Sequence, residues 1–200
     1  MSVTASASTE TGARERILDA AVELFALHGY DGTSVSQVIA EAGVAQGGFY
    51  HHFASKEALL YEVYGDLITR QLALMDDVVA QRLGATATLR AFVDVLVEST
   101  AASARQAIVF FREQGRLGDE RTAEYRAVRR RCHDMVVRLV RDGQASGEFA
   151  KVASPEMVTF TIFGVINELP IWYRPSGRQR PAQIAAELSA LVLAALGVKN

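Results

Sequence analysis

A stretch of residues near the N-terminus, Ala-Gln-Gly-Gly-Phe-Tyr-His-His-Phe at positions 45–53, carries side chains that suit contact with DNA. On a helix, Phe49 and Phe53 would share one face and point inward, which leaves the polar side chains and the glycines on the other face. Glutamine can hydrogen-bond base edges in the major groove, and glycines let the backbone approach the DNA closely. Tyrosine and histidine side chains can bind phosphates. The stretch therefore predicts a helix that touches DNA.

Two preceding helices would position this stretch. Apolar residues recur with helical spacing over residues 13–28 and again over 35–42. Ser34 and Gln37 have the spacing of a capping box, and Gly43 can end the second helix in a tight turn. The order helix, glycine turn, short helix, glycine turn, short helix is that of a helix-turn-helix. The N-terminal half of the third helix, expected at 45–52, would then read the bases.

The residues expected to contact DNA are the polar side chains that could bind phosphates or base edges and the small residues beside them. Residues 1–56 hold three basic and six acidic side chains, which is not the charge pattern typical of a DNA-binding domain. Most of the acids lie on the first helix, which could face away from the duplex. Pattern alone therefore leaves a plain three-helix packing unit as an equal alternative. The expected DNA contacts are Thr33, Ser34, Ala45, Gln46, Gly47, Gly48, Tyr50, His51, His52 and Lys56.

The composition of the whole chain predicts a globular protein. It has 200 residues, a net charge of −2, 50% hydrophobic residues and 22% charged residues, which excludes a polycation and bulk disorder. A single cysteine excludes an intrachain disulfide. No apolar stretch reaches the length of a membrane span, and the N-terminus has neither the basic start nor the apolar core of a signal peptide. We therefore expect a cytoplasmic protein that makes no membrane contact.

Beyond residue 56 the helical spacing continues, and no alternating strand pattern of useful length is present. A long helix is expected over 56–83, and shorter ones follow at 89–97, 106–114, 125–140, 155–172 and 181–195. The fold class is therefore all-α, with an N-terminal three-helix helix-turn-helix domain and a larger helical domain. We expect a flexible tail at 1–10, a DNA-binding domain at 11–56 and a ligand-binding and dimerisation domain at 57–200.

The larger domain is more apolar than a single buried stripe on each helix requires. In one interpretation its last two helices bury a second face in a dimer, through Phe160, Ile171, Leu188, Leu191 and Val192. In the other, the domain holds an apolar cavity in which a few polar groups fix a ligand. Both interpretations can hold together. The cavity would be lined by Phe92, Phe110, Phe111, Phe163, Asn167 and Trp172.

The N-terminal region resembles the TetR family of one-component transcriptional regulators. The resemblance is carried by GTSVSQVIAEAGVAQGGFYHHFASKEALL at 32–60 and by the preceding ILDAAVELFALHGYDGTS, with Tyr50-His51-His52-Phe53 and Ser55-Lys56-Glu57 in the positions of the family pattern. The resemblance implies a homodimer that binds a palindromic double-stranded DNA operator, usually as a repressor. It also implies phosphate contacts from Thr33, Tyr50, His52 and Lys56, and base contacts from residues 46–48.

A fainter resemblance concerns the effector. Phe110-Phe111-Arg112-Glu113, Ser146-Gly147-Glu148-Phe149 and the stretch 172–177 are similar to the branch of the family that senses fatty-acyl or steroid-derived CoA esters. This similarity implies a lipophilic thioester as the effector. A drug-like or aromatic molecule remains the alternative within the same class of regulator.

Other candidate sites have simpler explanations. Arg130, Asp134, Arg138 and Asp142 alternate in charge at a spacing of four, which is typical of a solvated helix face rather than of a phosphate site. Cys132 and His133 are adjacent on a helix and cannot share one metal ion, so we expect no metal and no cofactor. No catalytic motif is present. A helical ligand-binding protein or enzyme that does not bind DNA is the contrasting hypothesis.

Overall fold

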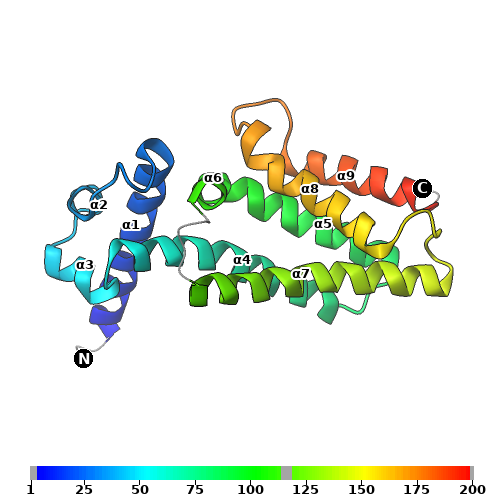
Figure 1. Ribbon diagram of the computed structural model, residues 1–200, viewed down its shortest axis with the longest axis horizontal. Helices are drawn as coiled ribbons and strands as arrows, with labels where there is room; N and C mark the ends of the chain where they lie inside the picture. Colours follow the sequence, from blue (N-terminus) through cyan, green and yellow to red (C-terminus); the bar gives the residue numbers. More distant parts are fainter. Residues whose placement is uncertain (1–3, 114–118, 199–200) are drawn as a thin grey trace. The chain divides into compact units, whose positions relative to one another are not determined.

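The computed structural model describes residues 4–113 and 119–198, and within these ranges it contains nine helices and no strand (Figure 1). The expected all-α fold is confirmed. No helix in the described ranges is long and apolar enough to cross a membrane. The helices are α1 (Thr4–His28), α2 (Val35–Ala42), α3 (Gln46–His52), α4 (Lys56–Ala80), α5 (Ala85–Ala102), α6 (Ala104–Glu113), α7 (Asp119–Ser146), α8 (Pro155–Trp172) and α9 (Pro181–Ala195).

The chain forms two compact units that are not simply successive in sequence. The first contains residues 1–66 and 105–122, and the second contains residues 67–104 and 123–200. Helix α4 therefore begins in the first unit and ends in the second, whereas α6 belongs to the first unit although α5 and most of α7 belong to the second. The sequence placed the end of the DNA-binding domain at residue 56, and that functional boundary stays a prediction.

In the first unit, α1 packs against the two short helices α2 and α3. Ile17, Ala21 and Phe25 of α1 are buried and lie one helical turn apart, as the sequence pattern predicted. Phe49 and Phe53 are also buried, with ring centroids 5.9 Å apart. Helix α1 begins at Thr4, within the segment that we expected to be a tail, because residues 4–11 contain no glycine or proline that would break a helix.

Both ends of α2 have the predicted caps. The Ser34 hydroxyl accepts a hydrogen bond from the backbone N–H of Gln37 at 3.2 Å, and the Gln37 side chain accepts one from the Ser34 N–H at 2.7 Å, which completes the capping box. Gly43 ends the helix with φ of +62°, in the left-handed region that favours glycine. The turn between α2 and α3 is therefore fixed by local sequence.

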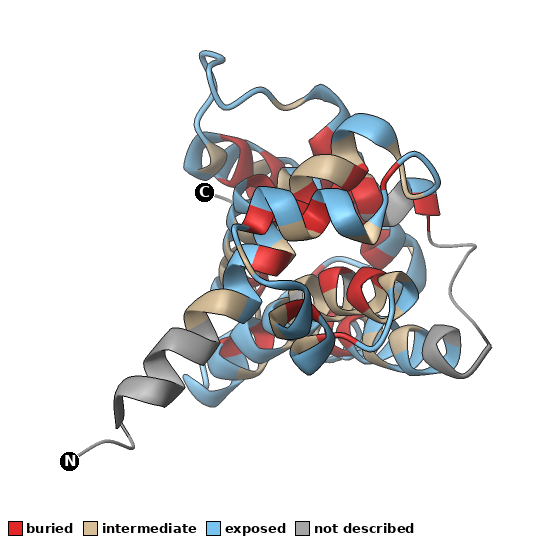
Figure 2. Cartoon of the chain, turned by 90° about the vertical axis from the view of Figure 1, so that its left-hand side faces the viewer, coloured by how far each residue is buried: buried red, intermediate tan, exposed pale blue. Residues whose placement is uncertain are grey.

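In the second unit, α5 is the central helix, because it packs against both α8 and α9. Its buried side chains include Phe92, Leu96 and Val97, and α7 adds Cys132, Met135 and Val136 to the same core. In Figure 2 the buried parts of the helices, in red, face inward, and the exposed parts, in pale blue, face outward. Cys132 is therefore a core residue, as predicted, and burial raises the pKa of its thiol to about 11.

The loop after α7 joins two helix ends of the second unit. Phe149 is buried, and its ring lies against Gly143 in the last turns of α7. The Glu148 carboxylate accepts hydrogen bonds from the backbone N–H groups of Ala85 and Thr86, at 3.3 and 2.7 Å. These bonds lower the pKa of Glu148 and cap the N-terminus of α5, where a negative charge is favourable.

Replacing Gly143 with alanine should destabilise the second unit. A Cβ at this position would lie 2.3 Å from Cδ2 of the Phe149 ring. Because the ring is buried, it has little room to move away. We expect G143A to lower the free energy of unfolding by about 1–3 kcal/mol in a denaturant titration. The control is Gly164→Ala in α8, where a Cβ would meet nothing within 4 Å. Equal stability of the two variants would contradict this packing.

Candidate nucleic-acid interface

Helix α3 presents an uncharged polar face that its own unit leaves uncovered. Gln46, Gly47 and His51 are exposed, and Tyr50 retains 51% of its surface although its ring touches Phe49 edge-on. Gly48 and His52 are partly exposed. Ala45, at the N-cap, makes no side-chain cap. The residues of 45–52 predicted to touch DNA therefore share one accessible surface, while Phe49 anchors the helix from behind.

The two glycines of α3 have no role that the packing of the chain explains. A Cβ on Gly47 would meet nothing within 4 Å, and a Cβ on Gly48 would lie at an ordinary 3.9 Å from Cβ of Val44. Neither residue has a positive φ. Each glycine costs a helix about 1 kcal/mol relative to alanine. The packing of the described chain does not explain why glycine stands at these two helix-destabilising positions. Close approach of another molecule to the backbone would explain it.

Thr33 and Lys56, both predicted to bind phosphates, contact the protein itself. The Thr33 side chain is 1% exposed, and its hydroxyl lies 2.9 Å from the Gly29 carbonyl oxygen and 3.2 Å from that of Leu24. The Lys56 ammonium donates hydrogen bonds of 2.8 Å to the carbonyl oxygens of Tyr30 and Thr33. It also lies 4.1 Å from the centroid of the Tyr30 ring. The two side chains thus hold the turn between α1 and α2, and their contact with phosphate stays a prediction.

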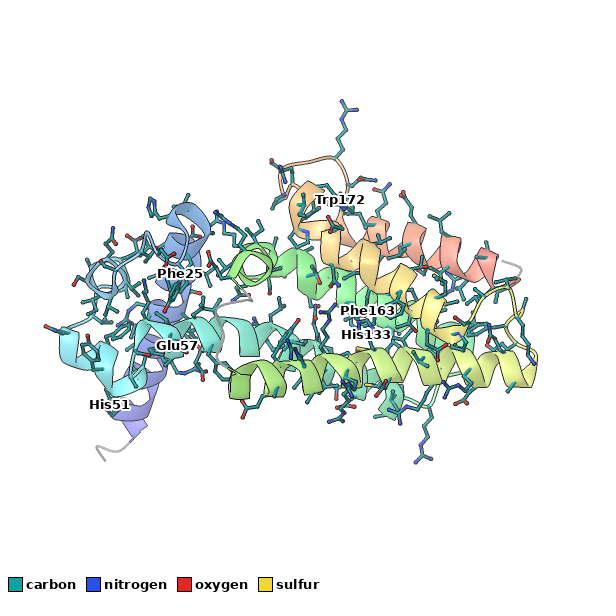
Figure 3. The ribbon with its side chains drawn as sticks, in the orientation of Figure 1. Phe25, His51, Glu57, His133, Phe163 and Trp172 are labelled. Atoms are coloured by element: carbon teal, nitrogen blue, oxygen red, sulfur yellow. The ribbon has the colours of Figure 1, made fainter. Side chains whose placement is uncertain are left out.

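The basic residues of α1 are also engaged within the first unit. Arg14 forms an ion pair with Glu62 of α4 at 2.5 Å, and Arg16 donates a 3.2 Å hydrogen bond to the carbonyl oxygen of Ala42 at the end of α2. Ser34, exposed at the start of α2, has its hydroxyl in the capping box. Helix α3 itself contains no lysine, arginine, aspartate or glutamate, and Figure 3 shows His51 on this helix.

Comparisons with known proteins decide the family. The family described as bacterial regulatory proteins, tetR family, matches residues 17–63, and the tetracyclin repressor-like C-terminal domain matches residues 82–196. This chain belongs to the TetR family. The second match covers more than half of the chain, and the first covers the helix-turn-helix. The TetR-family chain is thus a DNA-binding transcriptional regulator and not an enzyme, which confirms that prediction.

Two curated relatives and one solved structure align with nearly the whole chain. The HTH-type transcriptional repressor KstR2 of Rhodococcus jostii is 26% identical over 188 residues, which cover 93% of this chain and 92% of the relative. The fatty acid metabolism regulator protein of Bacillus subtilis is 25% identical, covering 92% and 95%. The structure of the ketosteroid transcriptional regulator KstR2 of Mycobacterium tuberculosis superposes with a TM-score of 0.84 at 25% identity, covering 94% and 95%.

Four of the six residues predicted to line an effector cavity lie at several depths in the second unit, whereas Phe110 and Phe111 belong to α6 of the first unit. Phe92 is buried in the core, Phe163 is nearly so, and Asn167 is half-buried. Trp172, at the end of α8, is 44% exposed. The side chains of Phe110 and Phe111 lie outside the described residues. The cavity stays a prediction.

The residues predicted to form a dimer interface fall into two groups. Phe160, Ile171 and Leu191 are 61%, 60% and 71% exposed, which is unusual for large apolar side chains and leaves them available for a partner. Leu188 and Val192 are buried in the core of their own chain. The exposed group lies on α8 and α9, the helices that the sequence assigned to the dimer, and the interface itself stays a prediction.

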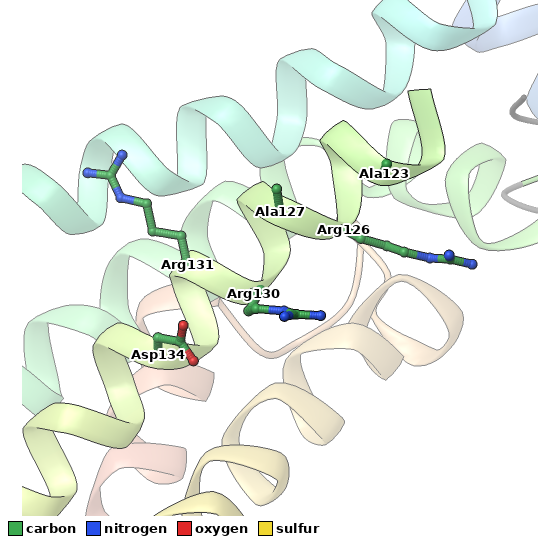
Figure 4. Close-up of a pocket in the computed structure, with 6 residues that line it drawn as sticks. All are labelled: Ala123, Arg126, Ala127, Arg130, Arg131 and Asp134. Atoms are coloured by element: carbon green, nitrogen blue, oxygen red, sulfur yellow. The ribbon is translucent and has the colours of Figure 1, made fainter. Parts of the chain in front are cut away.

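The arginines of α7 lie on an exposed face. Ala123, Arg126, Ala127, Arg130, Arg131 and Asp134 line a shallow hollow along the helix (Figure 4). Arg131 turns away to form two hydrogen bonds with the Asp76 carboxylate, at 2.8 and 3.0 Å. Its side chain and that of Asp76 are about half exposed, so the pair stabilises the unit only weakly. This arrangement agrees with the solvated face that the alternating charges indicated.

Sequence reasoning considered His133 only as a metal ligand and missed its packing. Its ring stacks on Phe163 with centroids 4.1 Å apart, and Figure 3 shows these two residues side by side. The ring also lies 5.9 Å from the ring centroid of Phe160. Nε2 of His133 is buried and has no hydrogen-bond partner in the described chain. Burial and the nearby charge of Arg129 lower the pKa of His133, against the opposing charge of Asp134.

Acidification should therefore destabilise the second unit through His133. The unfolded state binds a proton at a higher pH than the folded state, so the free energy of unfolding should fall as pH drops below about 6.5 and through the folded pKa. His133→Phe keeps an aromatic ring and removes the titration. We expect unfolding curves recorded from pH 7.5 to 5 to show a smaller loss of stability in this variant. Parallel curves for the two proteins would contradict the assignment.

Removing the Thr33 hydroxyl should destabilise the first unit. Thr33→Val keeps the shape of the side chain and leaves the carbonyls of Gly29 and Leu24 without this donor, so we expect a loss of about 1–2 kcal/mol in unfolding free energy. Thr33→Ser keeps the hydroxyl and should lose less. Thermal unfolding followed by circular dichroism measures both. If Thr33→Val is as stable as wild type and only DNA binding falls, then Thr33 contacts phosphate rather than the turn.

Proposed function

We propose that two copies of this chain bind a palindromic operator through α3, repress the genes beside it, and release it when a lipophilic effector binds the second unit. The observation that carries the DNA-reading part is the exposed face of α3. Gln46 and Tyr50 are exposed on it, and among the described residues a Cβ on the adjacent Gly47 would meet nothing within 4 Å. Such a face can lie in the major groove with its backbone close to the DNA.

The side chains of α3 suggest which contacts would supply the specificity of DNA binding and which would supply its affinity. Gln46 can form a bidentate hydrogen bond with an adenine edge, and Tyr50, His51 and His52 can contact phosphates. Arg14, Arg16 and Lys56 are engaged with the protein. Few lysine or arginine side chains would then neutralise phosphate charges. Recognition of the operator would depend more on shape and on hydrogen bonds. Two half-sites read together supply the affinity that one such domain lacks.

Dimerisation is supported by the exposed apolar side chains of α8 and α9. Phe160, Ile171 and Leu191 each expose more than half of their surface. A two-fold axis would bring the same patch of each copy against the other, and these side chains would then be buried in both copies. The symmetry of such a dimer matches a palindromic operator.

An apolar effector is supported by the composition of the second unit and by the relatives. The relatives of this chain include a regulator named for ketosteroids and one named for fatty acid metabolism. The resemblance of residues 110–113 and 172–177 to regulators that sense CoA esters narrows the proposal to a fatty-acyl or steroid-derived CoA ester. A drug-like or aromatic ligand is the competing effector class.

Helix α4 could transmit the effect of effector binding from the second unit to the DNA-binding helices. It begins at Lys56, which holds the turn before α2, and runs on into the second unit. An effector that binds better to one position of α4 would shift the population toward that position and change the spacing of the two recognition helices. Scattering data that show the same separation with and without effector would contradict this lever.

Gly47→Ala separates DNA binding from stability. The added methyl meets nothing in the chain and removes a helix-weakening glycine, so stability should stay equal or rise by up to about 1 kcal/mol. The same methyl would stand between α3 and the groove, and we expect operator affinity to fall at least about tenfold. Fluorescence anisotropy measures this with a duplex from upstream of the gene, beside a shuffled duplex.

The matched control is Gly65→Ala in α4, another glycine where a Cβ meets nothing within 4 Å. It should leave operator affinity unchanged. Gln46→Ala and Tyr50→Ala should also abolish preference for the native duplex while the chain stays folded. Full operator affinity in all three α3 variants would assign DNA reading to another surface.

The effector class is tested on the preformed operator complex. Hexadecanoyl-CoA, free hexadecanoate, free CoA and a neutral aromatic compound are titrated separately. The aromatic compound is neutral because a planar aromatic cation such as ethidium binds DNA itself. We expect only the thioester to release the duplex, because it alone combines the apolar chain with the CoA group. Release by a neutral aromatic compound, and none by the thioester, would favour the competing class.

A further inference from the structure

One buried polar atom of the second unit differs from the others. Among the buried side-chain nitrogen and oxygen atoms of the described residues, Nε2 of His133 is the one without a hydrogen-bond partner. The buried hydroxyl of Thr159, by contrast, donates to the carbonyl oxygen of Pro155 at 2.8 Å. That of Thr88 donates to the carbonyl oxygen of Leu83 at 3.3 Å. Buried polar groups in folded proteins are nearly always paired, so the exception requires an explanation.

The rings around this atom lie between α7 and α8. The imidazole stacks on the Phe163 ring with an angle of 13° between the two planes, and the Phe160 ring is its second aromatic neighbour (Figure 3). A buried water needs two to four polar partners, and neither ring offers one. A polar atom on an otherwise apolar ligand needs a single partner. Nε2 of His133 can be that partner.

His133 also adjoins residues that the sequence assigned to the effector cavity. Phe163, on which the imidazole stacks, is one of them, and Asn167 follows one turn later on the same side of α8. Phe163 is 8% exposed and Asn167 is half-buried. His133 therefore adds a hydrogen-bonding atom from α7 beside the part of α8 that was predicted to line the cavity.

The imidazole is suited to a neutral hydrogen-bond acceptor. Burial and the charge of Arg129 lower the pKa of His133, so the ring is neutral at pH 7. A neutral imidazole with its proton on Nε2 donates one hydrogen bond, which a carbonyl oxygen can accept. A carboxylate at the same place would have to lose its hydration beside two apolar rings, which is costly. The site therefore favours an ester carbonyl over a free acid.

The packing of the chain does not itself require the nitrogen of His133. A phenylalanine at this position could stack on Phe163 in the same way, and it would leave no buried polar atom without a partner. An unpaired buried donor or acceptor lowers the stability of a protein. Positions that depart from the most stable choice of residue are typical of functional sites. The nitrogen is thus explained by a bound molecule better than by the fold.

We propose that His133 is a specificity-determining residue of the effector site, and that its Nε2 donates a hydrogen bond to the thioester carbonyl oxygen of a fatty-acyl or steroid-derived CoA ester. The proposal rests on the thioester effector proposed above and names the atom that recognises it. The stack on Phe163 holds the imidazole in place for this bond. Both residues belong to the second unit.

The test compares two ligands that differ only at the carbonyl. Hexadecanoyl-CoA has the thioester, and S-hexadecyl-CoA has a methylene in place of the carbonyl group. The full chain, without DNA, is titrated into each ligand in a calorimeter, so that the ligand stays dilute and forms no micelles. We expect wild type to bind the thioester at least about fivefold more tightly than the thioether. In His133→Phe, which keeps the stacked ring and removes Nε2, this ratio should fall to about one.

Two further variants separate recognition from packing. His28→Phe makes the same substitution at an exposed histidine of α1 and should keep the wild-type ratio. His133→Gln keeps an N–H donor at about the reach of Nε2 and should recover part of the preference. A purely structural role of His133 would weaken both ligands alike and leave the ratio unchanged in His133→Phe. That result would overturn the proposal, as would a wild type that does not prefer the thioester.

A spectroscopic readout on the wild-type chain needs no loss of function. With ¹⁵N-labelled histidine, we expect the Nε2 signal of His133 to differ between the thioester and the thioether complexes. The signal is assigned by its absence in His133→Phe, or in His133→Gln if the first variant does not fold. An identical signal in the two complexes would overturn the proposal.

The outcomes distinguish this proposal from the one on which it rests. If wild type binds neither CoA ligand, the thioester effector is wrong, and the assignment of His133 to its carbonyl falls with it. If the thioester binds and releases the operator, but wild type and His133→Phe have the same ratio, the effector proposal stands and the role of His133 alone is rejected.

Discussion

The arrangement of the first unit depends on how the turn after α1 is held. A turn of this kind leaves backbone carbonyl oxygens that need hydrogen-bond donors. Here one ammonium group donates hydrogen bonds to two of these oxygens. Lys56 donates to Tyr30 and Thr33 and lies against the Tyr30 ring, while the buried Thr33 hydroxyl donates back toward the end of α1. The entry angle of α2, and through the Gly43 corner that of α3, follows from this set of bonds.

This constraint bears on the low positive charge around the face of α3 that we propose to read DNA. Two of the cations near this surface also fix backbone geometry: Lys56 at the turn, and Arg16 at the end of α2. The exposed face of α3 contains two glycines, which would permit close contact with DNA. If this face reads DNA as we propose, shape and hydrogen bonds would supply the specificity, and a second copy would raise the affinity.

The elements that could be predicted from sequence are those fixed by near neighbours. The Ser34–Gln37 capping box, the left-handed Gly43, the buried Phe49 and Phe53, and the Ser154-Pro155 start of α8 all follow from residues within one or two turns. The exposed face of α3 follows in the same way, since burying Phe49 leaves the other side free. The family resemblance added the role of that face, which helical spacing alone left undecided.

What could not be predicted depends on contacts distant in the sequence. The spacing of Thr33 and Lys56 gives no sign that both side chains meet at one turn of their own chain. Their contact with phosphate stays a prediction. Helix α6 lies within the larger domain in sequence, and its contacts with α1, such as the hydrogen bond from Arg112 to Ala26, have no counterpart in the local sequence pattern. His133 was judged by its neighbour Cys132, whereas its environment is set by Phe163 of another helix.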